Sequence, residues 1–569
     1  MSWLANKCFS PALCCRSGQK TVCNNLNQSP FAPLQVPAFR MLWLGNVVSN
    51  FGGLVQAVGA AWLMTLIAAS DTQVALVQAS TTLPVMAFSL LSGAVADSYD
   101  RRRVMLLSQL FMFGASVALV VVTYLELINA WSLLGLTFLI GCGVAFNNPA
   151  WQASVRDFVG MDLLPRAVLL NGVGFNVTRS VAPAIGGVIV ATGGAIVAFV
   201  INAASYIGVI FAVWSWQGPP RQAASHREPL RSAIAAGVRY VRQSPNLRRL
   251  YIRGFIFGFS AITVLALLPL ITRDLLAGSS LSYGILLGAF GLGAVVAGVT
   301  SERVARRFKS EQMVRLAFLA LAITVVVCSL SRWFVLTMAA VSLGGWAWVT
   351  ALALFNTTVQ LSTPRWVVGR AMSFYQMFTF GGMALGSWIW GLLVETHSLS
   401  FALQVSASSM GIGLVLGFWR PLPSREELNL DPLDRWREPN LGLDIVPRSG
   451  PVSVVVEYLI GDEDVDEFSV LMRERRRIRR RDGARQWTLL RDLEQPNQWI
   501  ERFDLPTWAD YVRLHSRTTQ EDGKIGDRVR ILHQGSEPPR VRRMLVRDPG
   551  DLGVARAEAG TDRSSWGLS

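Results

Sequence analysis

Long apolar runs alternate with short polar links between residues 39 and 419. Each run holds about twenty residues, and a helix that rises about 1.5 Å per residue crosses a hydrocarbon core of roughly 30 Å with that length. After residue 420 no run of this length follows. The pattern predicts an all-α membrane part of twelve transmembrane helices. The expected spans are residues 39–66, 73–96, 104–125, 131–152, 167–191, 194–216, 250–271, 281–300, 312–330, 333–356, 371–394 and 399–419.

The composition supports a membrane protein, because 51% hydrophobic and 16% charged residues are too apolar a mixture for a soluble globule of 569 residues. Residues 1–420 hold 28 Lys and Arg against 11 Asp and Glu, a net of +17, and residues 421–569 hold 25 against 27, a net of −2. The basic charge therefore belongs to the membrane part, where loop arginines set the orientation. No nucleic-acid partner is expected.

The arginines are distributed unequally among the links. Links after even-numbered spans hold most of them, including Arg101, Arg102 and Arg103, whereas links after odd-numbered spans hold only Arg273 and Arg332. Because Lys and Arg mark cytoplasmic loops, we expect both termini and the central linker to be cytoplasmic. The chain is expected to be a multi-pass protein of the inner or plasma membrane, with the lipid bilayer as a partner.

The stretch GAVADSYDRRRVM, residues 93–105, lies between the second and third expected spans and has a counterpart in GVTSERVARRFK, residues 298–309. The two stretches share glycine, an acid and two arginines at a constant offset of 205 residues. The matched positions are Gly93 with Gly298, Asp97 with Glu302, Arg101 with Arg306, and Arg102 with Arg307. This repeat predicts two six-helix halves from one duplicated unit, a common plan among secondary transporters.

The first stretch resembles the loop signature of the major facilitator superfamily, with Asp100 where that signature often has glycine. FRMLWLGNVVSNFGG from Phe39 and RAVLLNGVGFNVTRSVAPAIGG from Arg166 resemble the branch of enterobactin-type exporters, also called transmembrane secretion effectors. The resemblance covers residues 39–420. It implies a carrier that works by alternating access, with a loop that latches its two halves together and Arg370, at the start of span eleven, as a second cation of the latch.

The physical chemistry of the loop permits two interpretations. Glycine at position 93 lets helices approach closely, and Asp97 can pair with Arg101 or face the positive end of a helix, as a latch requires. A short basic loop also acts as a plain topology signal, and this interpretation fits Arg102 and Arg103.

Polar positions inside the spans are candidates for a substrate cavity, because polar groups are costly in lipid. Arg179 lies near mid-membrane in span five without an acid nearby in sequence, so its partner is an anionic substrate or a hydrogen bond across helices. APAIGG follows it and resembles the span-five motif of superfamily antiporters, with Pro183 bending the helix and Gly186 and Gly187 permitting close packing.

Several amides lie in spans that line the central cavity in this fold, or in span eleven. They either bind substrate or hydrogen-bond between helices at roughly 0.6 kcal/mol each. These amides are Asn46, Asn50, Gln56, Asn147, Asn148, Asn356, Gln360 and Gln376.

The source of energy for transport is given by the resemblance alone, which implies proton coupling. No Asp or Glu lies well inside an expected span, so no coupling residue is assigned, and no Gly-x-x-x-x-Gly-Lys-Ser/Thr motif for ATP occurs. No cofactor and no metal are expected. The cysteines near the amino terminus lack a Cys-x-x-Cys pair.

The tail reads as a small cytoplasmic α+β domain of ferredoxin-like type, because strand, helix, strand, strand and helix patterns follow one another. It resembles the antibiotic-biosynthesis monooxygenases, which implies a dimer through this domain. Trp487, Trp499, Trp508 and His515 either line an apolar pocket or form core, and we prefer a regulatory or dimerising role to catalysis.

The resulting division has seven parts. They are a disordered extension (1–37), a six-helix half (38–216), a cytoplasmic linker (217–249), a second six-helix half (250–420), a linker (421–450), the α+β domain (451–546) and a disordered tail (547–569).

Three functions compete on the sequence. Export of a small molecule such as a siderophore, drug or metabolite fits best, uptake by the same fold is second, and a transporter fused to an active monooxygenase is third. The chain is expected to be a transporter rather than an enzyme.

The latch interpretation of the loop is testable at Asp97. We expect Asp97→Asn to insert into the membrane normally and to transport poorly, because the amide cannot hold an ionic latch. Transport and surface abundance measured side by side check this, and wild-type flux in the variant would refute the latch.

Overall fold

The computed structural model describes residues 31–216, 230–364, 366–419, 421–422, 429–433, 435–437, 439 and 441–547. The side chains of Asp97, Glu302 and Arg306 lie outside the described residues, as do nearly all of the expected disordered extension and tail. Two compact units emerge. The helical unit is Met1–His226, Leu250–Thr357 and Ser373–Leu422, and the α+β unit is Arg227–Arg249, Thr358–Met372 and Pro423–Ser569.

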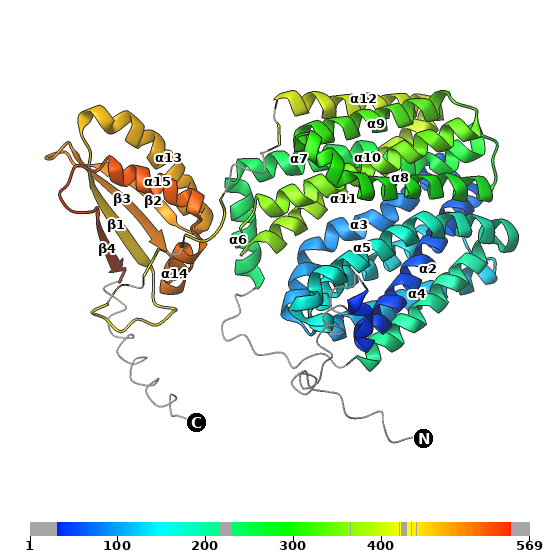
Figure 1. Ribbon diagram of the computed structural model, residues 1–569, viewed down its shortest axis with the longest axis horizontal. Helices are drawn as coiled ribbons and strands as arrows, with labels where there is room; N and C mark the ends of the chain where they lie inside the picture. Colours follow the sequence, from blue (N-terminus) through cyan, green and yellow to red (C-terminus); the bar gives the residue numbers. More distant parts are fainter. Residues whose placement is uncertain are drawn as a thin grey trace, which may run out of the picture. The chain divides into compact units, whose positions relative to one another are not determined.

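The helical unit is built almost wholly of long helices (Figure 1). Three of them, α7, α10 and α11, have one end in the α+β unit. The elements are η1 (Ala32–Gln35), α2 (Pro37–Ile67), α3 (Asp71–Ser98), α4 (Arg101–Tyr124), α5 (Ala130–Ser215), α7 (Pro245–Leu270), η2 (Ile271–Leu275), α8 (Ser280–Arg307), α9 (Ser310–Leu330), α10 (Phe334–Leu361), α11 (Val368–Thr396) and α12 (Leu399–Trp419).

Eleven helices among the described residues are long and apolar enough to cross a membrane. Three expected spans fall within α5, which counts as two such helices, Ala130–Val159 and Asp162–Ser215. The expectation of twelve transmembrane helices therefore stays a prediction.

The chain reverses direction inside α5 at Gly194. This glycine has a φ of +73°, which lies outside the right-handed helical region and is readily adopted only without a side chain. Residues before it run parallel to α2, and residues after it run antiparallel to α2. The close approaches that show this are Gly174 to Trp43 and Gly186 to Val58 before Gly194, and Gly45 to Val209 and Gly59 to Ala198 after it.

Side-chain caps fix where two of these helices begin. The Asp100 carboxylate accepts a hydrogen bond from the backbone N–H of Arg103 at 3.1 Å and so caps α4. Asn129 and Ser132 form a reciprocal capping box at the start of α5. The acid that replaces the usual glycine of the loop signature thus has a structural role in starting α4.

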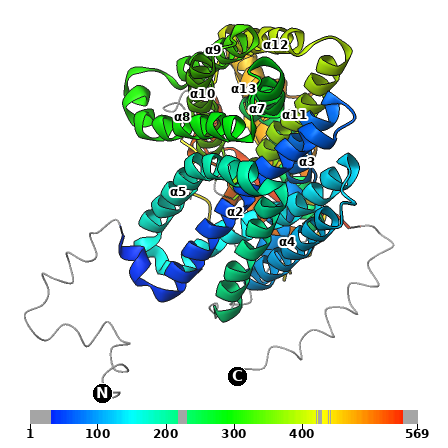
Figure 2. The same ribbon diagram turned by 90° about the vertical axis from the view of Figure 1, so that its right-hand side faces the viewer.

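Helices α2–α5 and α7–α12 form two groups, which Figure 2 shows beside each other. The groups meet closely along α5 and α8, where a Cβ added at Gly187 would lie 2.8 Å from the Cα of Gly284. They also meet along α3 and α11, where Gly391 faces the backbone of Thr72. Glycine is needed at these positions because the two backbones touch.

The α+β unit contains a four-stranded antiparallel sheet with the strand order β2-β3-β1-β4. Helices lie along one face of this sheet, and α6 comes from the central part of the chain (Figure 1). The elements are α6 (Leu230–Gln243), β1 (Val452–Leu459), η3 (Asp462–Asp464), α13 (Val465–Asp482), β2 (Arg485–Arg491), β3 (Gln498–Leu505), α14 (Trp508–Arg517), α15 (Gln520–Ile531) and β4 (Arg540–Leu545).

The core of this unit lies between the sheet and the helices. Alternate residues of the strands point into it, including Val454 and Phe503, which lie side by side and are 1% exposed each. The expected strand and helix order is present, but one expected helix is two, because Thr519 caps α15 and ends the continuation of α14. The expected helix covered residues 508–522, so the rest of α15 and strand β4 were not expected from the sequence.

Candidate functional site

An ionic contact joins the two helix groups at the end of the helical unit where α2 finishes and α3 begins, which we call the distal end. Arg273 donates a hydrogen bond to the Asp71 carboxylate at 3.0 Å and another to the Thr65 carbonyl at 3.1 Å. Nearby, the Thr72 hydroxyl donates to the Glu395 carboxylate. Both contacts pair α2 or α3 with the end of a helix of the second group, so they hold the distal end closed.

Farther from the distal end, backbone packing between α5 and α8 holds the two helix groups together. Gly187 lies against Gly284, and Gly291 lies against the backbone of Arg179 and Ser180. Of the motif, Pro183 and Gly187 lie against Gly284 in this crossing, whereas Gly186 lies against Val58 of α2.

Arg179 lies at the end of this crossing that is farther from the distal end, where Gly291 approaches its backbone. Its guanidinium is 5.6 Å from the ring centroid of Phe290 on α8, and no hydrogen bond or ion pair joins it to any described residue. The side chain is partly buried. Of the two partners that the sequence allows, a hydrogen bond across helices is absent from the described part of the chain.

Two of the candidate amides hydrogen-bond between helices. Gln56 accepts from Asn202 and lies 3.4 Å from the Ser116 hydroxyl, and Asn147 accepts from Gln109 at 3.3 Å. These contacts match the helix-joining alternative for Gln56 and Asn147. They lie within the first helix group.

The other candidate amides are less buried. Asn46, Asn50 and Gln376 are partly buried and have no hydrogen-bond partner among the described residues, and Asn148 is exposed. Asn356, also partly buried, belongs to the helical unit, whereas Gln360 belongs to the α+β unit.

The arginines of the loop signature contact their own half. Arg101 donates to the Asp157 carboxylate at 2.8 Å and to the Ala153 carbonyl at 3.0 Å. Arg102 donates to the Val213 carbonyl at 3.2 Å, near the end of α5. These contacts tie α4 to two distant parts of the folded-back α5 rather than one half to the other.

The glycine of the signature does lie between the halves. A Cβ at Gly93 would be 3.2 Å from the Ser373 hydroxyl on α11, whereas a Cβ at Gly298 would meet nothing within 4 Å. Arg307 is exposed. Arg370 lies in the α+β unit, where its side chain packs against Gly237 of α6.

A buried ion pair that was not expected from the sequence joins α7 to α9. Arg253 donates to the Glu311 carboxylate, and Arg315 donates to the other oxygen of Glu311 at 3.1 Å. Glu311 also accepts from the backbone N–H of Leu422 at 2.8 Å, which holds the chain after α12 in place. The signal in the sequence was the i, i+4 spacing of Glu311 and Arg315 at the start of an apolar run.

A buried carboxylate organises the interior of the α+β unit. Glu501 of β3 has no exposed surface and accepts from Arg475 at 2.9 Å, from the Trp487 indole at 3.0 Å and from the Tyr458 hydroxyl at 2.9 Å. Burial alone would raise the pKa of Glu501, but Arg475 and Arg479 outweigh it and lower the pKa to about 2. Glu501 is therefore a structural anion.

The four expected pocket residues form two groups rather than one. Trp487 bonds Glu501, and Trp499 packs on Phe468 with ring centroids 5.6 Å apart. Trp508 and His515 lie on α14 and share the Tyr511 ring between them, at 4.9 and 4.8 Å. All four contribute to the core of the unit or pack beside it, which agrees with the core interpretation.

His515 lies in a positive environment. It stacks on Trp436 with ring centroids 5.0 Å apart, and Arg475 and Arg479 of α13 and Arg543 of β4 act on it. Burial, together with these three arginines, lowers the pKa of His515 to about 3. The imidazole is therefore neutral at physiological pH.

Helix α6 packs on α13 inside the α+β unit. The Arg481 guanidinium lies 5.2 Å from the Tyr240 ring centroid, and the Tyr240 ring meets Trp366 edge to face at 5.5 Å. Arg477 donates to the Gln243 carbonyl at 3.1 Å and so caps the last turn of α6. The α+β domain thus contacts the part of the chain expected as the central linker.

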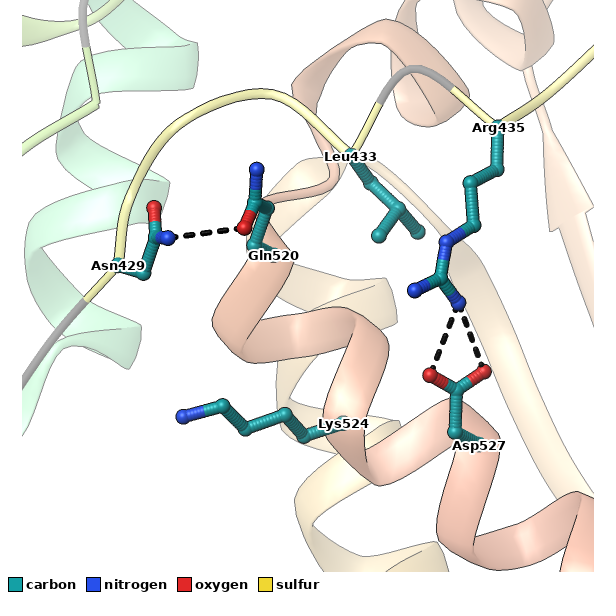
Figure 3. A pocket seen from close by; sticks show the side chains of 6 residues that line it. All are labelled: Asn429, Leu433, Arg435, Gln520, Lys524 and Asp527. Atoms are coloured by element: carbon teal, nitrogen blue, oxygen red, sulfur yellow. Dashed lines mark hydrogen bonds and ion pairs between the residues drawn. The ribbon is translucent and has the colours of Figure 1, made fainter.

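The chain before the domain is also fixed to it. The backbone of Leu433 donates to the Thr518 carbonyl at 3.0 Å, and one guanidinium nitrogen of Arg435 donates to both carboxylate oxygens of Asp527, at 2.9 and 3.1 Å. A polar pocket of about 360 Å³ lies between this segment and α15 (Figure 3). Its lining residues are Asn429, Leu433, Arg435, Gln520, Lys524 and Asp527.

The ionic contact at the distal end is testable with Arg273→Gln. We expect this end to open more often, by up to about fivefold, because a partly exposed pair contributes up to about 1 kcal/mol. In a variant whose six native cysteines are serine, the reactivity of Ala75→Cys toward an impermeant thiol reagent measures the opening, since Ala75 is fully buried there. Arg332→Gln is the matched control, and equal reactivity in both would refute the gating role.

The neutral His515 predicts a pH dependence of the α+β unit. An unfolded histidine takes up a proton near its ordinary pKa of 6.5 and the folded one only near 3, so the free energy of unfolding falls as the pH drops through this window. We expect His515→Gln to reduce the fall between about pH 7 and about pH 5. Calorimetry of the full chain measures it, with His397→Gln as control; an unchanged slope contradicts the assignment.

Comparisons with known proteins agree with this architecture. The family model described as "Transmembrane secretion effector" matches residues 28–549. Enterobactin exporters EntS of Escherichia coli O1:K1 / APEC and Shigella boydii serotype 18 are each 24% identical over 384 residues, which cover 67% of this chain and 90% of theirs.

Solved structures show the same fold. The nucleoside transporter NupG matches with a TM-score of 0.55 at 11% identity, over 67% of this chain and 98% of its own. The POT family transporter PepTSo matches with a TM-score of 0.56 at 12% identity, over 68% and 97%. The chain therefore belongs to the transmembrane secretion effector family and is a multi-pass membrane transporter of the major facilitator type.

Proposed function

We propose that this transporter exports a small anionic molecule by alternating access, coupled to protons, with both termini on the cytoplasmic side. The observation that carries the choice of an anion is Arg179, whose guanidinium lies at the junction of the halves without a hydrogen-bond or ion-pair partner among the described residues. Such a charge in a low-dielectric setting favours an opposite charge on the substrate. The enterobactin exporters at 24% identity support export over uptake.

Contacts at both ends of the helical unit support alternating access. Arg273 joins the halves at the distal end, and Gly93 approaches Ser373 near the other end of α3. The side chains of Asn46, Asn50 and Gln376 form no hydrogen bond with a described residue, and we propose that they complete the substrate cavity. Gly93, Asp97 and Arg370 are proposed as parts of the latch, and proton coupling follows from the family resemblance.

The role of Arg179 is tested by metabolite analysis. We compare medium and cytoplasm of cells that lack the transporter with cells that express wild type, Arg179→Met or Arg179→Lys. Wild type should enrich anionic metabolites in the medium, and Arg179→Met should reduce their export by about tenfold to a hundredfold, since a hydrogen bond to a charged group contributes about 1.5–3 kcal/mol. Arg179→Lys should retain part of the flux.

The outcomes separate the competing functions. Arg332→Gln serves as the control, because it removes an exposed arginine from an outer link of the expected topology. Enrichment in the cytoplasm would indicate uptake, and export of only neutral or cationic compounds would refute an anionic substrate.

We infer a dimerising role for the α+β domain from its open sheet face. The strand residues that point away from the helices include Leu490 and Met544, which are 49% and 46% exposed. A second copy of the same face would cover this apolar surface. We expect Leu490→Glu to convert dimers of the full chain in detergent to monomers, as light scattering measures, and monomeric wild type would refute the inference.

A further inference from the structure

The interior of the α+β unit holds more positive than negative charge. Arg475 and Arg479 lie four residues apart on α13, and Arg543 reaches in from β4. The carboxylate facing them is Glu501, and Arg475 donates a hydrogen bond of 2.9 Å to one of its oxygens. Arg479 approaches Glu501 only at 3.5 Å. Among the described residues, Glu501 is thus the one carboxylate shared by Arg475 and Arg479, and with Arg543 the cluster holds an excess of two positive charges.

These guanidiniums face a common row of the sheet. The Arg479 guanidinium lies 4.8 Å from the ring centroid of Phe503, which is paired with Val454. Val454 is paired on its other side with Arg543, so Arg479 and Arg543 lie on either side of Val454 above the same face. Arg543 donates to the Tyr511 hydroxyl at 2.5 Å, which is its one hydrogen bond to a described residue.

Hydrogen-bond donors near this row lack acceptors. The Nε of Arg479 and the indole Nε1 of Trp436 are buried, and neither has a hydrogen-bond partner among the described residues. Buried donors without acceptors are costly, by about 1–3 kcal/mol each, so a water or a bound group with acceptor atoms would stabilise this place. An anion with several acceptor oxygens would neutralise the excess positive charge and accept hydrogen bonds from these donors.

Aromatic rings surround the same place. Trp436 stacks on His515 with an interplanar angle of 6°, and Tyr511 meets His515 edge to face. The neutral imidazole lies among the three arginines, where a ligand oxygen can accept from it or from them. Flat apolar surfaces beside guanidinium groups suit a ring that carries a carboxylate.

We propose that Arg479, Arg543 and His515 form a binding site for an aromatic carboxylate between the sheet and helices α13 and α14. The site is distinct from the transport pathway at Arg179. It gives the domain a ligand of its own and makes it a sensor, because α13 also carries the arginines that hold α6.

The test uses the purified full chain with salicylate as probe and salicylamide as its neutral match. Calorimetric titration should detect salicylate binding and none of salicylamide, at constant ionic strength. Arg543→Gln and Arg479→Gln should each raise the Kd at least about tenfold, because each removes a charge-assisted contact. Arg502→Gln, which removes a charge on the other sheet face, should bind as wild type does.

Two further arms keep the result decisive. Arg179→Met should bind salicylate normally, so loss in that variant would place the ligand in the transport pathway and overturn the site. Without salicylate, Arg543→Gln should unfold no more readily than wild type, since it removes an unbalanced charge. Absence of salicylate binding, equal binding of salicylamide, or unchanged binding in both Arg479→Gln and Arg543→Gln would likewise overturn the proposal.

Discussion

The cost of holding a guanidinium in a low-dielectric interior shapes the helical unit. Arg253 and Arg101 are each matched by a carboxylate from another helix, and Arg102 is matched by backbone carbonyls. Each match ties together segments distant in sequence. Loss of the partner would cost most at Arg253, whose side chain is 4% exposed against 22% for Arg101. Arg179 differs from these arginines, because the same cost applies to its charge and no described residue forms a hydrogen bond or ion pair with it.

The way the halves meet follows from a second constraint, close packing without side chains. At Gly187 and Gly284 the backbones of α5 and α8 touch, so this crossing cannot slide without separating. The distal contact of Arg273 with Asp71 is different, because it is partly exposed and replaceable by water. A carrier needs both kinds of contact: a firm crossing about which the halves turn, and weak contacts at the ends that break and re-form.

The sequence predicted those features that depend on local pattern. Hydrophobic length indicated the spans, and the glycines of APAIGG indicated close helix packing without identifying the partner helices. It did not reveal the Arg253–Glu311 pair, because these residues lie 58 positions apart and only tertiary folding brings them together. The roles of Arg101 and Arg102 were missed for the same reason, since their partners at Asp157 and Val213 belong to distant parts of α5.

In the α+β unit, α6 packs against a buried ion network on α13. Arg481 is held by Asp482 and Asp522 through paired hydrogen bonds of 2.7 to 3.1 Å, and its flat face lies over Tyr240. The Tyr240 ring keeps water from a buried ion network, so separating α6 from α13 would hydrate three charged groups at once. That coupling makes the position of α6 dependent on the packing of α13. Since α6 leads directly into α7, any change in α13 has a covalent route into the second helix group.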